Sequence, residues 1–271
     1  MLRGKHKRYE KLYLYSLNQQ HPALHEISDE DFIGCWEEDG LAILFFHRPK
    51  RALVQNLARK LGLNLEDEAE VSYDEWGEGR KVKVLQIGPI TLRPVWQAGE
   101  GLRFDPGVVF GSGNHPTTRL CLSWIYRLWK ESGPFKKAVD LGCGAGLLSL
   151  LLTALGAEVL AADFNPLCVA LTQKNLVINN LAQKARVIRE DVRKLPPFEA
   201  DLVVANLFKG LLLDLFGLPS FWTAKHYLLS GFSPSMEEEL KKALWSGAKI
   251  RGREEKDGWV IWYLENKKGH P

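Results

Sequence analysis

The stretch DLGCGAG, residues Asp140 to Gly146, decides the fold that this sequence predicts. An apolar run at 138–141 precedes its glycines, and a run with helical spacing at 147–155 follows them. Glycine permits a sharp backbone turn and lets a ligand approach the backbone closely. A helix that starts at such a turn presents its free N–H groups at the same place. The stretch therefore predicts a strand, a ligand-binding loop and a helix in succession.

The same rhythm continues from Pro134 to the end of the chain. Helical patterns at 147–155, 167–178 and 235–244 separate short apolar or β-branched runs at 138–141, 158–162, 185–189, 201–205 and 227–230. A run rich in aromatic residues, 259–264, follows them as a further strand. Such alternation is typical of right-handed βαβ crossovers, in which helices cover both faces of a parallel sheet. The predicted fold class is α/β, with a doubly wound, Rossmann-like sheet.

The first hundred residues have a different pattern. Extended runs at 10–17 and 40–46 precede a helical pattern at 50–61, which stops at Gly62. Strand-like runs at 81–87 and 90–95 follow, separated by the turn signal Gly88-Pro89. We therefore expect a small α+β domain at residues 1–96, a linker at 97–101 and the doubly wound domain at 102–271.

The spacing of glycines and acids limits what the loop binds. A dinucleotide-binding loop needs a third glycine where this chain has Leu147 or Ser149, and no Gly-Lys-Ser/Thr of a phosphate-binding loop follows. Asp163 ends the next strand, where an acid accepts hydrogen bonds from ribose hydroxyls. This spacing favours S-adenosylmethionine as the cofactor, and hence a methyltransferase.

Two further polar residues follow strands of the predicted sheet. Asp191 follows the run at 185–189 and is a candidate contact for the adenine amine, although an exposed loop acid is the alternative. Asn206 follows the run at 201–205. If the strand order reverses between the first and fourth strands, Asn206 lies at the edge where ligands bind. Its amide oxygen is then able to accept a hydrogen bond from an amine nucleophile, and the alternative role is a helix N-cap.

Composition narrows the remaining possibilities. The 271 residues are 45% hydrophobic and carry a formal net charge of +3, too small a charge to identify a nucleic-acid partner. A basic cluster near the N-terminus offers an RNA contact or simply a solvated terminus: Arg3, Lys5, Lys7, Arg8 and Lys11. The cysteines have no zinc spacing, so no metal is expected. No apolar run is long enough to span a bilayer, and no signal peptide is evident, so we expect a cytoplasmic protein.

The segment FDPGVVFGSGNHPTT, residues Phe104 to Thr118, resembles a signature of the PrmA family, which methylates the large-subunit ribosomal protein number eleven. The likeness continues through the glycine loop and through Ala205-Asn206-Leu207, and it covers about 96–231. It implies a seven-stranded methyltransferase sheet, a preceding domain that docks the protein substrate, and a lid at 104–115. The predicted cofactor-binding residues are Phe104, Thr118, Asp140, Gly142, Gly144, Gly146, Asp163, Asp191 and Asn206, and Asn206 is also the predicted catalytic residue.

The resemblance predicts transfer of a methyl group to lysine or N-terminal amines of that ribosomal protein. The alternatives are a different protein lysine, RNA or a small molecule, and a non-catalytic module that binds the cofactor. Three departures from the family pattern bear on the substrate: Asn114 replaces a threonine, Asn165 replaces an acid, and Phe208-Lys209 replaces small or aliphatic residues. His115 is a candidate base or a structural residue that holds the loop before Pro116.

Overall fold

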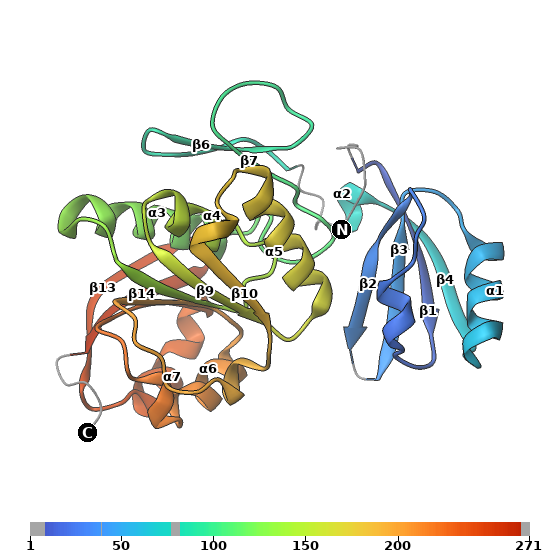
Figure 1. The fold of residues 1–271 in the computed structure, drawn as a ribbon. Helices are drawn as coiled ribbons and strands as arrows, with labels where there is room; N and C mark the ends of the chain where they lie inside the picture. Colours follow the sequence, from blue (N-terminus) through green and yellow to red (C-terminus); the bar gives the residue numbers. More distant parts are fainter. Residues whose placement is uncertain (1–8, 39, 77–81, 267–271) are drawn as a thin grey trace.

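The computed structural model describes residues 9–38, 40–76 and 82–266. The predicted basic cluster lies outside these residues except for Lys11, which forms an ion pair with Glu70. In the part of the chain that the structure describes, no helix is long and apolar enough to span a bilayer. Figure 1 shows a small sheet with one helix beside a larger domain in which helices cover both faces of a sheet.

The small sheet is antiparallel, with the strand order β2-β3-β1-β4. Its strands are β1 (Lys11–Leu17), β2 (Phe32–Glu38), β3 (Leu41–Phe46) and β4 (Leu65–Ser72). Helix α1 (Arg51–Leu61) ends at Gly62, whose φ of 70° is the left-handed cap expected of a glycine there. The side chains of α1 and the sheet share one buried apolar cluster, which includes Leu44, Phe46 and Val54. The short elements η1 (Pro22–His25) and α2 (Tyr73–Trp76) flank this unit.

A three-stranded sheet follows, formed by β5 (Leu85–Ile87), β6 (Ile90–Pro94) and β7 (Leu102–Phe104). Strands β6 and β7 are paired in parallel, so residues 97–101 connect two strands of one sheet. The domain boundary that we predicted at 97–101 stays a prediction.

The large sheet has seven strands in the order β10-β9-β8-β11-β12-β14-β13. The strands are β8 (Lys137–Leu141), β9 (Glu158–Asp163), β10 (Ala185–Arg189), β11 (Leu202–Asn206), β12 (His226–Phe232), β13 (Ala248–Lys256) and β14 (Trp259–Asn266). The first five are parallel, and β14 is antiparallel to both of its neighbours. The strand order reverses at β8, which lies between β9 and β11, and this confirms the condition on which the role of Asn206 depended.

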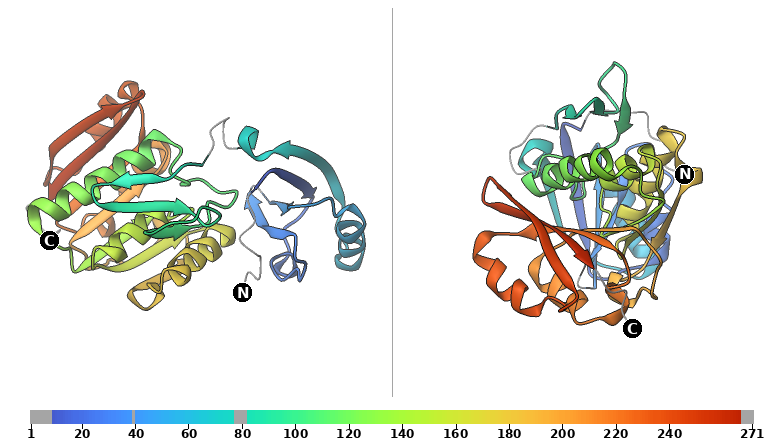
Figure 2. Two further views of the ribbon diagram at one scale, coloured as in Figure 1. Left: turned by 90° about the horizontal axis from the view of Figure 1, so that it is seen from above. Right: turned by 90° about the vertical axis from the view of Figure 1, so that its left-hand side faces the viewer.

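Helices cover both faces of this sheet, as Figures 1 and 2 show. Helices α3 (Pro116–Ser132), α4 (Leu147–Ala154) and α5 (Pro166–Ile178) lie on one face, and α6 (Lys209–Phe216) and α7 (Glu237–Ala243) lie on the other. Two separate buried apolar clusters correspond to these two faces. The predicted doubly wound α/β fold is therefore confirmed.

Strands β4 and β13 have no apolar pattern that reveals them. Their sequences, LEDEAEVS and AKIRGREEK, are strongly charged and mostly exposed. Both lie at a sheet edge, where pairing with β1 or β14 satisfies the backbone and solvent accepts the charged side chains.

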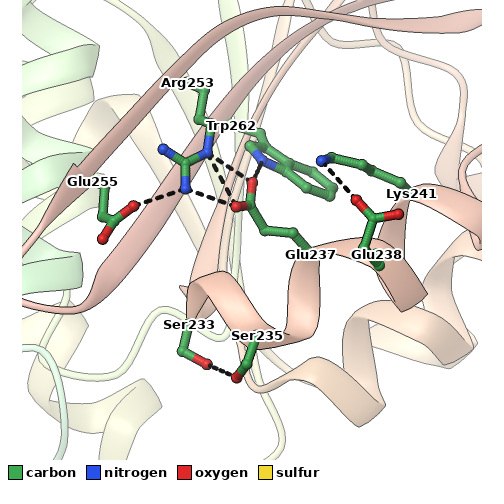
Figure 3. Close-up of polar contacts among 8 residues, drawn as sticks. All are labelled: Ser233, Ser235, Glu237, Glu238, Lys241, Arg253, Glu255 and Trp262. Atoms are coloured by element: carbon green, nitrogen blue, oxygen red, sulfur yellow. Dashed lines mark hydrogen bonds and ion pairs between the residues drawn. The ribbon is translucent and has the colours of Figure 1, made fainter.

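A buried carboxylate attaches the terminal hairpin to α7 (Figure 3). Glu237 accepts hydrogen bonds from the Trp262 indole at 2.7 Å and from both Nε and Nη2 of Arg253 at 2.9 and 2.7 Å. Arg253 also reaches Glu255 on the same strand. These bonds hold β13 and β14 against α7.

Candidate active site

The glycine loop adopts backbone angles that favour glycine. Gly142, Gly144 and Gly146 have φ values of 71°, 52° and 77°. A Cβ at Gly142 would lie 2.4 Å from Leu207, and one at Gly144 would lie 2.5 Å from the carbonyl oxygen of Phe110. The loop therefore needs glycine both for its backbone angles and for the close approach of its neighbours.

The loop uses its N–H groups internally. Each of five consecutive donors finds an acceptor within the protein: Gly142 and Cys143 on the Ala162 carbonyl, Gly144 on the Asp163 carboxylate, Ala145 on the Phe110 carbonyl and Gly146 on the Cys143 carbonyl. A phosphate-binding loop points such groups at its ligand instead. The geometry agrees with the sequence in favouring a ligand that brings no phosphate to this loop.

Asp140 is a buried carboxylate with one free oxygen. Its Oδ2 accepts hydrogen bonds from the Ser149 backbone N–H at 3.0 Å and from the Ser149 hydroxyl at 2.6 Å. Its Oδ1 is buried and accepts none. Burial raises the pKa of Asp140 to about 6, because the charged form loses its hydration. The residue therefore supports helix α4 with one oxygen and leaves the other available to a ligand.

Asp163 ends β9 beside the loop. Its Oδ2 accepts from the Gly144 N–H at 3.0 Å and its Oδ1 from the Asn165 N–H at 2.9 Å. Burial raises the pKa of this carboxyl group. The next residue, Phe164, has 55% of its surface exposed, an unusual position for a phenylalanine. The sequence analysis assigned no role to Phe164, although it directly follows the predicted ribose-binding acid.

Asn206 ends β11 at the switch point of the sheet. Its Oδ1 is buried without a hydrogen-bond partner. The alternative role as an N-cap is not adopted, because Phe208 occupies the N-cap position of α6 and makes no side-chain capping bond. Asn206 thus holds a free acceptor at the edge where a ligand is expected.

Two more buried polar atoms without partners belong to residues of this region. Asn165 caps α5 through its Oδ1, which accepts from the Leu167 N–H at 3.0 Å, but its Nδ2 finds no acceptor. Thr118, in the first turn of α3, is 1% exposed and its hydroxyl has no partner. Buried polar groups are normally satisfied, so four such atoms are candidate contacts for a polar ligand: Asp140 Oδ1, Asn165 Nδ2, Asn206 Oδ1 and Thr118 Oγ1.

His115 caps helix α3. Its Nδ1 accepts from the Thr117 N–H at 3.3 Å and lies 2.7 Å from the Thr117 hydroxyl, so the ring caps α3. The ring also lies between Phe110 and Trp259, with ring centroids 5.2 and 4.6 Å away. These contacts fix the start of α3 close to the first residue of β14.

Phe104 and Asp191 have surroundings that the sequence did not predict. Phe104 is fully buried in the apolar core, so a direct contact with a cofactor would require the segment around it to move. The carboxylate of Asp191 accepts hydrogen bonds from the Arg193 guanidinium, which also contacts Asp214. Arg193 lowers the pKa of Asp191. Their predicted roles in cofactor binding stay predictions.

The positive charge of Lys209 is paired with an acidic residue. Its ammonium group lies 2.5 Å from a carboxylate oxygen of Glu239 on α7. This ion pair ties α6 to α7 and offsets the charge of the Lys209 ammonium group.

A cavity of about 310 Å³ lies between the small domain and the segment 107–115. The aromatic residues that line it are Trp36, Phe45, Tyr73, Trp76, Phe110 and His115. The Tyr73 hydroxyl donates to the Gly107 carbonyl at 2.6 Å, and the Trp76 indole donates to the Val108 carbonyl at 2.9 Å. The small domain therefore contacts the same segment whose Phe110 carbonyl binds the glycine loop.

Comparisons with known proteins agree with this architecture. The model of the family described as ribosomal protein L11 methyltransferase (PrmA) matches residues 52–267. A ribosomal protein L11 methyltransferase of Symbiobacterium thermophilum is 31% identical over 220 residues, which are 74% of this chain and 70% of the relative. One from Tolumonas auensis is 36% identical over 195 residues, 68% of this chain and 64% of the relative.

Among solved structures, a ribosomal protein L11 methylase from Lactobacillus delbrueckii subsp. bulgaricus is similar with a TM-score of 0.58 and 25% identity. The match covers 68% of this chain and 99% of that chain. The family match, the relatives and the shared fold together identify the chain as a methyltransferase. The chain belongs to the PrmA family of ribosomal protein L11 methyltransferases.

Proposed function

We propose that this protein methylates amines of ribosomal protein L11, at lysine side chains or the N-terminal amine, with S-adenosylmethionine as the methyl donor. Four buried, unpartnered polar atoms around the glycine loop carry the proposal. The names of the relatives supply the substrate. The small domain, residues 1–96, is proposed to dock that substrate.

The residues present suit this cofactor. The carboxylate of Asp163 is suited to a ribose diol, and the exposed ring of Phe164 offers a flat apolar face to an adenine. The free Oδ1 of Asp140 is an acceptor for an ammonium group. When bound, S-adenosylmethionine supplies a sulfonium methyl group that passes to the lone pair of a neutral amine, leaving a thioether and a released proton.

Asn206 orients the acceptor amine. A lysine amine has a pKa of about 10.4 in water and carries a proton at neutral pH. Removal from water disfavours that charged form. The neutral amine donates an N–H to the free Oδ1 of Asn206, and this bond fixes the direction of its lone pair. Such positioning of two reactants is the main demand of a direct transfer.

The deciding experiment is methyl transfer from isotopically labelled S-adenosylmethionine to unmethylated L11, with the modified residues located by mass spectrometry. The expected result is label on L11 amines with the wild-type chain and strongly reduced label with Asn206→Ala. Label on another protein or on RNA, with L11 unlabelled, would refute the substrate and leave the methyltransferase assignment intact. The predicted RNA contact through the basic N-terminus and the cytoplasmic location stay predictions.

A further inference from the structure

One arginine joins the small domain to the loop that follows Asp163. Arg189 is the last residue of β10 and is the register partner of Asp163 on β9. Its Nη2 donates to Glu37 Oε2 at 2.6 Å, and its Nε donates to the carbonyl of Phe164 at 3.2 Å. The same guanidinium therefore contacts strand β2 of the small domain and the residue next to the proposed ribose-binding acid.

Glu37 is held on both sides. The residue is 7% exposed, and its second oxygen lies 2.6 Å from Nε2 of His25. His25, Cys35 and Glu37 are also a group of metal-ligand types within 4.8 Å of one another among the described residues. Both carboxylate oxygens of Glu37 already have partners in His25 and Arg189, so the ion pair explains its burial without a metal. A buried carboxylate that loses its cationic partner is strongly destabilised.

A second contact brings β2 against the same loop. Gly34 lies on Leu167, in the first turn of α5, so closely that a Cβ on Gly34 would lie 2.2 Å from a Leu167 methyl group. Asn165, the N-cap of α5, lies between this contact and Asp163. Strand β2 thus packs on the helix start and, through Arg189, holds the backbone of Phe164.

We infer that Glu37 and Arg189 form a positioning pair through which the small domain holds the cofactor loop, residues 163–167, in its binding conformation. The inference rests on the proposed function, since it names the loop as the ribose site. Arg189 acts on the loop through the Phe164 carbonyl, and Glu37 keeps the guanidinium in the orientation that makes this bond. Glu37 lies outside the match to the family model, which begins at residue 52, so family membership does not predict the pair.

The pair makes cofactor affinity depend on a residue of the small domain. By thermodynamic linkage, whatever strengthens the contact of β2 with the catalytic domain must also strengthen cofactor binding, and the reverse holds to the same extent. Binding of the protein substrate to the small domain is expected to strengthen this contact and, with it, cofactor binding.

The test is the affinity for S-adenosylhomocysteine, measured by titration calorimetry on the full chain. Glu37→Gln and Arg189→Met are each expected to weaken binding by about tenfold, within the usual range of coupling between sites. The double variant is expected to be no weaker than either single variant, because the two residues act as one unit. Arg189→Lys keeps the charge but loses the fork that makes both bonds, so its affinity should be intermediate.

Arg186→Met is the matched control, since Arg186 is an exposed arginine on the same strand, and it should leave the affinity unchanged. Thermal unfolding of each variant verifies that it is folded at the temperature of titration. A merely structural pair would change the melting temperature of each variant and leave its affinity for S-adenosylhomocysteine unchanged.

Two outcomes would overturn the inference: unchanged affinity in Glu37→Gln while Arg189→Met binds weakly, or additive losses in the double variant. Either one would leave the proposed function standing. Failure of the wild-type chain to bind S-adenosylhomocysteine would instead refute the proposed function itself, so the two failures are distinguishable.

Discussion

Two buried carboxylates, Asp140 beside the glycine loop and Glu237 at the start of α7, differ in how their oxygens are used. Asp140 is 1% exposed and Glu237 is 6% exposed. Both oxygens of Glu237 are hydrogen-bonded, as Figure 3 shows, and the Arg253 guanidinium lowers its pKa. Asp140 has one free oxygen and no cationic partner, and burial raises its pKa to about 6. Similar burial thus accompanies opposite pKa shifts.

The difference separates a structural contact from a ligand site. A buried acid that is paired with a guanidinium, as Glu237 is, contributes mainly to the folded structure. An acid that keeps an unsatisfied oxygen lowers stability and retains an interaction that a ligand can complete. Substitutions at fully paired groups such as Glu237 should therefore change stability. Substitutions around the glycine loop should change ligand binding or turnover.

The largest effect is expected for Gly144→Ala. The new Cβ would lie 2.5 Å from the backbone oxygen of Phe110, at a φ of 52°, so the loop must move. The backbone conformation alone costs about 1–3 kcal/mol, and S-adenosylhomocysteine binding should be lost. Gly62→Ala is the control, because its φ is 70° but no atom lies within 4 Å. Equal losses of affinity in both variants, by calorimetry, would contradict the role of the loop.

Asn206→Ala should lower kcat by about a hundredfold, because the acceptor amine loses its orienting partner. Affinity for S-adenosylhomocysteine should stay close to that of the wild type. Single-turnover kinetics with saturating cofactor measure the effect. A rise in KM alone would mean that Asn206 binds the substrate without orienting it.

Glu237→Gln should reduce the free energy of unfolding by about 2 kcal/mol, since it leaves Arg253 without its main anionic partner. Cofactor affinity should not change. The lowered pKa of Glu237 means that its stabilisation is present above the unfolded value of 4.5 and is lost as the pH falls through the folded value. Urea unfolding over a series of pH values from 7 downward provides the measurement, and a difference that does not shrink as the pH falls would argue against the ion pair.

Asp140→Asn should increase the free energy of unfolding by about 1 kcal/mol at pH 8, whereas Glu237→Gln reduces it. Between the unfolded pKa of 3.8 and the folded value of about 6, the native state holds the proton more tightly, so wild-type stability falls as the pH rises through this window. The variant should therefore be more stable than wild type at pH 8 and lose that advantage near pH 4. Its affinity for S-adenosylhomocysteine should be lower at pH 8, and an unchanged affinity would remove Asp140 from the site.

The smallest effect is expected for Lys209→Met. The Lys209 ammonium pairs with Glu239 near the surface, where such a pair contributes less than about 1 kcal/mol. Melting temperature and the choice of methylated amine in L11 should both change little. A shift of methylation to other residues, located by mass spectrometry, would show that Lys209 selects the substrate.

Much of the catalytic domain follows from local sequence. Helix α5 was predicted at 167–178 and runs from Pro166 to Ile178, because an N-cap asparagine, a proline and apolar spacing all favour the same start. Charged edge strands such as β4 and β13 were not evident, since pairing with a neighbour and not their own pattern makes them strands. His115 had open alternatives in the sequence, because its capping contact with Thr117 is not visible in the residue pattern. The two alternatives for Asp191 stay open.

The sequence by itself determined the strand–glycine loop–helix unit, the acid after β9 and the asparagine after β11, because backbone conformation and periodicity are encoded over a few residues. Only the tertiary structure decided which polar atoms of Asp140 and Asn206 stay free, and that Arg189 reaches Glu37, which is 152 residues away along the chain. Free atoms and long-range pairs depend on distances between separate segments, and packing alone sets those distances.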